Sequence, residues 1–244
     1  MKISVVVTHF NQYELLKGCL ASLAMQVRLP DEIIIVDDNS SSLVLLSEVQ
    51  DLVPAQVTLI LNSTNHGGPA IPRNQGVNTC SCSHLVFIDA DDILFPQAIQ
   101  AMQSVWLDNP SSIVYGDQIS YGYAKRKPIY QSALQVSSRH QKVNLFKHML
   151  HHGNQIFFSG SGGPTELFKD FPFDENQQWE DYDLWLRLAQ SGKQFTHTRQ
   201  LHTLYRIQNG SRSGSRQARH AGCRGIKEKH LLRQPIWSLP LWYW

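Results

Sequence analysis

Two features are scarce in this sequence of 244 residues: cysteine and long apolar stretches. The four cysteines have no spacing typical of a disulfide framework, and the Cys-Ser-Cys segment at 80–82 has no second Cys/His pair at zinc-site spacing. No run approaches the roughly 20 apolar residues that cross a bilayer. The opening MKISVVVTHF has too short an apolar run for a signal peptide. We therefore expect a cytoplasmic protein whose mature chain begins at Met1.

Charge of one sign is scarce as well, because the formal net charge is only +2. This small balance argues against a dedicated nucleic-acid-binding protein. Hydrophobic residues make up 42% of the chain and charged residues 17%, a composition that excludes global disorder. From Arg206 to the end, however, eight Lys/Arg face one acidic residue, so this segment carries +7 and the rest −5. Such a basic segment is typical of contact with an anionic ligand or surface.

Four short apolar runs, rich in β-branched residues, are typical of strands that are covered on both faces. They occupy residues 3–7, 32–36, 57–61 and 84–88. Helical patterns follow each run, after Asn11, from Leu43 to Leu52, after Pro69 and after Pro96. This alternation predicts βαβ units and a mostly parallel sheet with helices on both faces.

In such sheets ligands bind beyond the carboxyl ends of the strands. The loops there read THFN (8–11), DDNS (37–40), NSTNHGG (62–68) and DADD (89–92). Further along, the pattern predicts strands and turns over 113–131, a helix containing Leu145 to Leu150, a glycine-rich loop at 159–164 and a helix within 177–192. In that last helix, Tyr182, Trp185, Leu186 and Ala189 mark a buried face, and Gly192 supplies a cap.

Three aspartates within four residues, Asp89, Asp91 and Asp92, follow the fourth apolar run. Carboxylates this close repel one another, and a divalent cation such as Mg²⁺ or Mn²⁺ would offset the repulsion. The alternative is an acidic turn that caps the helix after Pro96. Both interpretations stay open on this motif alone.

Several other polar groups have both a structural and a chemical interpretation. Asp38 either caps the next helix or binds a ligand, and Arg73 is either a solvated side chain or a phosphate contact. Glu180 and Asp181 either offset the dipole of their helix or include a general base whose pKa is raised by neighbouring aromatic rings. The histidines of the H-x-x-H-H segment at 148–152 favour a solvated surface over zinc, because no glutamate follows the first of them.

The order of these segments resembles the family 2 glycosyltransferases, which have the GT-A fold, an α/β fold with a Rossmann-like, mostly parallel central sheet. The matching segments are VVVTHFN (5–11), IIIVDDNS (33–40), NHGGPAIPRNQG (65–76), HLVFIDADDILFP (84–96), HHGNQIFFSGSGGPTELF (151–168), WEDYDLWLRL (179–188) and YRIQNGSRS (205–213). The resemblance implies inverting transfer of a sugar from a nucleotide diphosphate, usually UDP, to an acceptor hydroxyl. It also implies a Mn²⁺ or Mg²⁺ cofactor and a place in polysaccharide or glycan synthesis.

The resemblance also implies roles for individual residues. Asp38 would bond the nucleobase, Arg73 would face the diphosphate, and Asp181 would deprotonate the acceptor. The expected donor contacts are Thr8, Phe10, Asp38, Arg73, Asp89 and Ala90; the metal ligands are Asp89 and Asp91; and the acceptor side comprises Gly162, Gly163, Pro164 and Glu180. Two positions depart from the family pattern: Gln208 stands where the family usually has histidine, and Pro72 stands where it has alanine before the arginine.

Two other classes of protein fit less well. A response-regulator receiver carries its paired acids after its first strand, whereas the run at 3–7 precedes them here. A phosphatase with a D-x-D-x-T motif would need threonine where Ile93 stands. A non-catalytic sugar-nucleotide-binding protein remains an alternative because of Gln208.

The chain is expected to form one domain over 1–213, with a nucleotide-sugar half (1–110) and an acceptor half (111–213), followed by a tail over 214–244. The tail ends in IWSLPLWYW (236–244), which contains three of the six tryptophans. Aromatic residues next to cations are typical of peripheral contact with an anionic membrane, here at its inner face. Packing against the body of the protein is the alternative.

Overall fold

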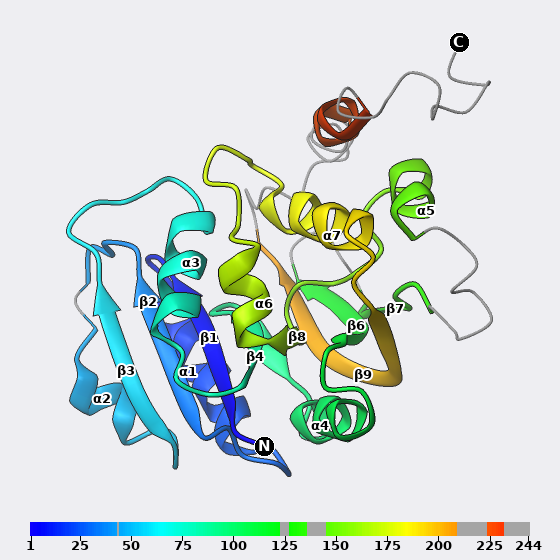
Figure 1. Cartoon of the computed structure of the whole chain (residues 1–244). Coiled ribbons are helices and arrows are strands. Elements are labelled where there is room, and N and C mark those ends of the chain that lie inside the picture. Colours follow the sequence, from blue (N-terminus) through cyan, green and yellow to red (C-terminus); the bar gives the residue numbers. More distant parts are fainter. Residues whose placement is uncertain (43, 123–126, 136–144, 209–223, 232–244) are drawn as a thin grey trace.

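A single mixed sheet runs through the molecule, and helices cover both of its faces (Figure 1). The computed structural model describes residues 1–42, 44–122, 127–135, 145–208 and 224–231. The strands are β1 (Ile3–His9), β2 (Glu32–Asp37), β3 (Gln56–Leu61), β4 (His84–Asp89), β5 (Ile93–Leu94), β6 (Ile113–Gly122), β7 (Ile129–Gln131), β8 (Ser161–Pro164) and β9 (Phe195–Ile207). The helices are α1 (Tyr13–Ala24), α2 (Leu46–Gln50), α3 (Ala70–Thr79), α4 (Ala98–Asp108), α5 (Leu145–His152), α6 (Thr165–Asp170) and α7 (Glu180–Gln190).

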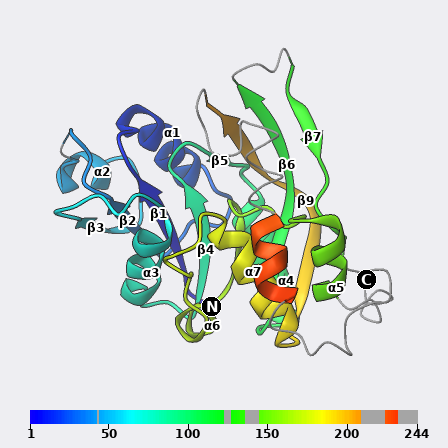
Figure 2. The ribbon, with the colours of Figure 1, turned by 90° about the horizontal axis from the view of Figure 1, so that it is seen from above.

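The first half of the sheet is parallel, in the spatial order β3-β2-β1-β4. Alternate residues of β1 point to opposite faces: Val5 and Val7 pack in a core with α1 and α4, whereas Val6 packs in the core that contains α3 and α7. Helices α1 and α3 accordingly lie on opposite sides of the sheet (Figure 2). Burial on both faces confirms the interpretation of the runs that form β1, β2 and β4, whereas the edge strand β3 is only partly buried.

The second half of the sheet departs from the mostly parallel arrangement expected. Strand β8 is antiparallel to both β4 and β6, β6 and β9 are parallel, and β5 and β7 are antiparallel to β9 and β6 respectively. The prediction of a glycine-rich loop at 159–164 was wrong for its second part, because Ser161–Pro164 is β8. Gly162 allows this pairing, since a Cβ atom there would lie 2.0 Å from the carbonyl oxygen of Leu85.

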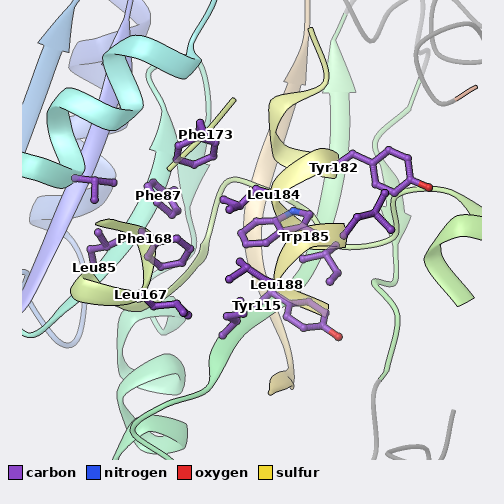
Figure 3. Packing of buried hydrophobic residues seen from close by; sticks show 14 of the residues in the cluster. Leu85, Phe87, Tyr115, Leu167, Phe168, Phe173, Tyr182, Leu184, Trp185 and Leu188 are labelled. Carbon is purple, nitrogen blue, oxygen red and sulfur yellow. The ribbon is translucent and has the colours of Figure 1, made fainter. Parts of the chain in front are cut away.

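Helix α7 packs its apolar face on the second half of the sheet (Figure 3). Tyr182 and Trp185 are fully buried, and the Trp185 ring lies at right angles to that of Phe195, with centroids 6.2 Å apart. The helix ends at Gln190 with Ser191 as its C-cap, and the next residue, Gly192, has a φ of +72° and donates its N–H to the carbonyl of Ala189, which is close to the predicted glycine cap. Packing along its length therefore anchors α7 on the sheet.

Part of the predicted tail packs on the body of the protein. Residues 224–231 form a helix in which Ile226 and His230 are 2% and 1% exposed. Lys229 Nζ and His230 Nε2 lie 2.7 and 2.9 Å from Oδ1 of Asp183 in α7. The aromatic segment 236–244 lies outside the described residues. Within the described ranges, no helix is long and apolar enough to span a membrane.

Candidate active site

The carboxyl ends of the parallel strands meet at one edge of the sheet, as the order of the runs predicted. Thr8 of β1 pairs in register with Asp89 of β4, and its Oγ1 donates a hydrogen bond of 3.0 Å to Asp89 Oδ1. On the other side of β1, the N–H of Asp38 donates to the carbonyl of His9. The loops after β1, β2 and β4 therefore lie side by side and form one site.

The aspartates after β4 have three different environments. The Asp89 side chain is 31% exposed, whereas Asp92 is fully buried. Burial, and then the charge of Asp89, raises the pKa of Asp91 above its usual range. Gln208 Nε2 donates to Asp91 Oδ2 over 2.7 Å, so the position that departs from the family pattern lies directly beside this carboxylate.

Asp92 joins the end of β4 to two later segments. Its Oδ2 accepts a hydrogen bond of 2.5 Å from Ser159 Oγ, and its Oδ1 accepts one of 2.9 Å from the N–H of Arg206. Burial, followed by the charges of Asp91 and Asp89, raises its pKa well above the usual value. The alternative that this acid caps the next helix was wrong, because Gln97 occupies the N-cap of α4.

Arg73 lies between the aspartates of β4 and the first turn of α7. Its Nη2 lies 2.8 Å from Asp89 Oδ1 and 3.1 Å from Oδ2, and its Nη1 donates to Glu180 Oε1. The residue is 4% exposed, and its guanidinium carbon lies 3.5 Å from the centre of the Phe158 ring. The solvated alternative for this arginine is thereby excluded, and its contact with a diphosphate remains a prediction.

Glu180 and Asp181 begin α7 and have distinct surroundings. Burial raises the pKa of Glu180 to about 7, although the charge of Arg73 acts in the opposite direction. Burial also raises the pKa of Asp181, again against Arg73. Asp181 is half-buried, and its Oδ2 accepts a hydrogen bond of 3.0 Å from Asn154 Nδ2. An oriented, partly accessible carboxylate with a raised pKa is suited to accept a proton.

A divalent cation at the carboxylates of Asp89 and Asp91 stays a prediction. No cluster of three His, Cys, Asp or Glu suited to a metal ion occurs in the described part of the chain. Mg²⁺, however, commonly uses one or two carboxylates and completes its shell with water and phosphate oxygens. A cation would offset the repulsion between Asp89 and Asp91, which adds to the effect of burial on the pKa of Asp91. These two residues would hold the metal together with the diphosphate.

The loop that connects β3 to α3 surrounds Asp38. Its Oδ1 lies 3.1 Å from Asn62 Nδ2 and 2.5 Å from His66 Nδ1, and its Oδ2 lies 2.9 Å from the N–H of His66 and 3.2 Å from Asn65 Nδ2. Helix capping by Asp38 is excluded, since the N-cap of α2 is Leu45. Binding of a nucleobase at this carboxylate remains a prediction.

Some predicted residues lie at the site and others do not. Phe10 is 44% exposed at the end of β1, and the buried Ala90 donates its N–H to the carbonyl of Thr8 over 3.1 Å. In contrast, Gly162, Gly163 and Pro164 of β8 pair with Val86, Leu85 and His84, so they lie inside the sheet, progressively further along β4 from Asp89. Sequence reasoning gave no signal for Asn154 and Ser159, whose contacts depend on the fold.

A curved α/β sheet with acidic groups at the ends of its parallel strands, and a further acid at the start of a facing helix, defines the GT-A class of fold. The sequence model for glycosyl transferase family 2 matches residues 4–162, which is most of the chain. The protein belongs to this family.

Relatives and solved structures agree with this assignment. The chain is 34% identical over 120 residues to a poly(ribitol-phosphate) beta-glucosyltransferase of Bacillus spizizenii, covering 48% of this chain and 19% of that protein. It is 25% identical over 182 residues to the poly(ribitol-phosphate) beta-N-acetylglucosaminyltransferase TarP of Staphylococcus aureus, covering 72% and 51%. Residues 1–349 of S. aureus TarS in complex with UDP superpose with a TM-score of 0.69 at 19% identity, covering 97% and 67% of the two chains. This likeness shows the fold. The chain thus spans about a fifth to half of the length of these curated relatives.

Proposed function

We propose that the protein transfers a sugar from a nucleotide diphosphate donor, a UDP sugar, to an acceptor hydroxyl with inversion at the anomeric carbon. The observation that carries this proposal is that Arg73 brings Asp89 of β4 and Glu180 of α7 together, so that the acids from two segments far apart in the sequence, Asp181 included, share one site. Structures of S. aureus TarS in complex with UDP and with UDP-GlcNAc support a nucleotide sugar as donor.

Each group would have one task in this reaction. Asp181 would accept the proton of the acceptor hydroxyl as its oxygen attacks the anomeric carbon, on the face opposite the departing diphosphate. Attack from that face by a single step inverts the configuration. Thr8, Phe10 and Asp38 would hold the nucleoside. A Mn²⁺ or Mg²⁺ ion held by Asp89 and Asp91 would supply positive charge near the leaving diphosphate.

The acceptor is proposed to be a hydroxyl of a polyol-phosphate polymer or a related glycan. Two relatives carry poly(ribitol-phosphate) in their names, and one of them matches over 72% of this chain. The helix at 224–231 brings Lys227 to the end of α5, where its Nζ donates to the carbonyl of His151, and so adds positive charge to this side of the protein. Positive charge would favour an acceptor that carries phosphate groups.

Replacement of the proposed base tests the assignment. We expect Asp181→Asn to bind UDP as the native protein does and to lose transfer from UDP-glucose and UDP-N-acetylglucosamine by about 10³-fold, the range typical of a general base. Calorimetry with UDP and Mn²⁺ would measure binding, and release of UDP in the presence of acceptor would measure transfer. Full turnover by the variant would refute the role of Asp181.

One observation favours a second function, a sugar-nucleotide-binding protein without catalysis. The Gln208 amide already donates a hydrogen bond to Asp91, a proposed metal ligand. Under this alternative the native protein would bind UDP in the calorimeter but release no UDP from either donor, with or without Mn²⁺. The same two measurements therefore separate the two functions.

A further inference from the structure

Arg73 connects two parts of the site that otherwise belong to different segments. It lies in α3, yet its guanidinium reaches Asp89 at the end of β4 and Glu180 in the first turn of α7. Asp181, the proposed base, follows Glu180 directly. One buried cation therefore joins the donor side of the site to the helix that carries the base.

The surroundings of Arg73 leave it little freedom to contact a ligand. Both terminal nitrogens are engaged by carboxylates, and one face of the guanidinium stacks on Phe158, with Phe173 at 5.6 Å. Its Nε is buried without a hydrogen-bond partner among the described residues. Turning this group toward a diphosphate would leave Glu180, which is 5% exposed, without its counter-charge. Burying an unpaired charge is costly, and removal of one partner from such a pair is strongly destabilising.

We infer that Arg73 is a positioning residue, which holds the first turn of α7 at a fixed place relative to Asp89 and does not contact the diphosphate. The inference deepens the proposed transfer reaction and rests on it. It replaces the phosphate contact that the family resemblance implied for this arginine.

The link that Arg73 makes between Asp89 and Glu180 would act on the position of the base, Asp181. A displacement of about 1 Å in a reacting group can lower the rate of a reaction about 10²-fold, because the attacking geometry is lost. The core anchors α7 through Tyr182 and Trp185, and Lys229 and His230 hold Asp183 at the end of its first turn. Arg73 adds an anchor at the first residue of the helix, Glu180, which precedes the proposed base.

The two possible roles of Arg73 predict different binding of UDP and UMP. A residue that contacts the diphosphate favours UDP over UMP, so its removal would reduce that preference at least tenfold. A positioning residue contributes nothing to the preference. For Arg73→Met we therefore expect the ratio of the UDP and UMP dissociation constants, measured by calorimetry with Mn²⁺, to stay within about twofold of the native ratio, while transfer falls about 10²-fold.

Two further variants keep the test decisive. If Arg73→Met does not fold, the double variant Arg73→Met/Glu180→Leu removes both buried charges together, which proteins tolerate better than the loss of one. Arg73→Lys keeps a positive charge but cannot hold both carboxylates with a planar fork. We expect Arg73→Lys to retain the native binding ratio and still lose transfer, whereas a phosphate contact would be largely restored by lysine.

A matched control and the native protein complete the experiment. Arg28→Met removes another arginine paired with an aspartate, Asp31, outside the site, and should change neither quantity. A UDP preference that collapses in Arg73→Met, or transfer that persists at the native rate, would overturn the inference alone. Failure of the native protein to bind UDP would overturn the proposed function and this inference with it.

Discussion

Replacing Gly162 by alanine should destabilise the protein, whereas the same change at the next residue should not. Gly162 is in β8, between β4 and β6. A Cβ atom there would lie 2.0 Å from the carbonyl oxygen of Leu85 and 3.0 Å from the Cα of Val86, both in the backbone of β4. At Gly163 the nearest neighbours of a Cβ atom would be 3.4 Å away, an ordinary contact.

The size of the effect follows from two opposing terms. Overpacking costs about 1–3 kcal/mol, and the upper part of that range applies where backbone must move. Alanine restricts the unfolded chain and returns about 0.4–1 kcal/mol. The net loss in the free energy of unfolding should be about 2 kcal/mol for Gly162→Ala, which lowers the melting temperature by about 4–8 °C in a chain of this size. Gly163→Ala keeps only the second term and should be neutral or stabilising by up to about 1 kcal/mol.

Urea denaturation of the native protein and the two variants, followed by circular dichroism, would measure both changes. Free energies of unfolding that agree within about 0.5 kcal/mol for the two variants would refute the reasoning. The experiment also separates two roles for β8. A residue that shapes the acceptor side would lose transfer at full stability, whereas a residue that packs between strands loses stability first.

Two further predictions concern buried carboxylates. The pKa of Glu180 is raised from 4.5 to about 7, so the folded state holds this proton more tightly, and the resulting stability, present below pH 4.5, is lost as the pH rises through 7. Between those pH values the free energy of unfolding of the native protein should fall by roughly 3 kcal/mol relative to that of Glu180→Gln. Urea denaturation that gives both proteins the same change in this free energy with pH would contradict the prediction. Burial favours the neutral form of Asp183, but hydrogen bonds from His230, Lys229 and Arg187 outweigh it and lower the pKa, so its contribution is present near neutral pH and is lost as the pH falls. Asp183→Asn should lower the free energy of unfolding by about 3–5 kcal/mol and speed hydrogen exchange in the helix at 224–231. The matched change Asp174→Asn, at a partly exposed partner of Lys229, should lower it by less than about 1 kcal/mol.

The parallel half of the fold could be predicted from the sequence because its signals are local. The apolar runs at 3–7, 32–36 and 84–88 became β1, β2 and β4 with one or two residues added at their ends. Pro72 was compatible with the first turn of α3, where the missing N–H is not needed. Strand order then placed Thr8 and Asp89 together, so the location of the site followed from topology.

The rest depended on contacts between distant segments. Strand β9 was not expected, because its buried positions include His197, His202 and Thr203, which are satisfied by specific partners and not by an apolar pattern. The charge on Arg73 suggested a ligand, whereas two carboxylates from β4 and α7 neutralise it. Asp92 looked like a helix cap for the same reason: its partners, Ser159 and Arg206, are 67 and 114 residues away.

The hydrogen bonds around Asp38 bear on how quickly a ligand could leave the protein. Asn62, Asn65 and His66 already donate to both oxygens of this carboxylate. A nucleobase that binds there must exchange with groups tethered to the same chain, which are present at a high effective concentration. The loop would then act as a built-in competitor: it weakens the affinity for the nucleotide, and it closes behind the departing product, so that release is fast and rebinding is discouraged.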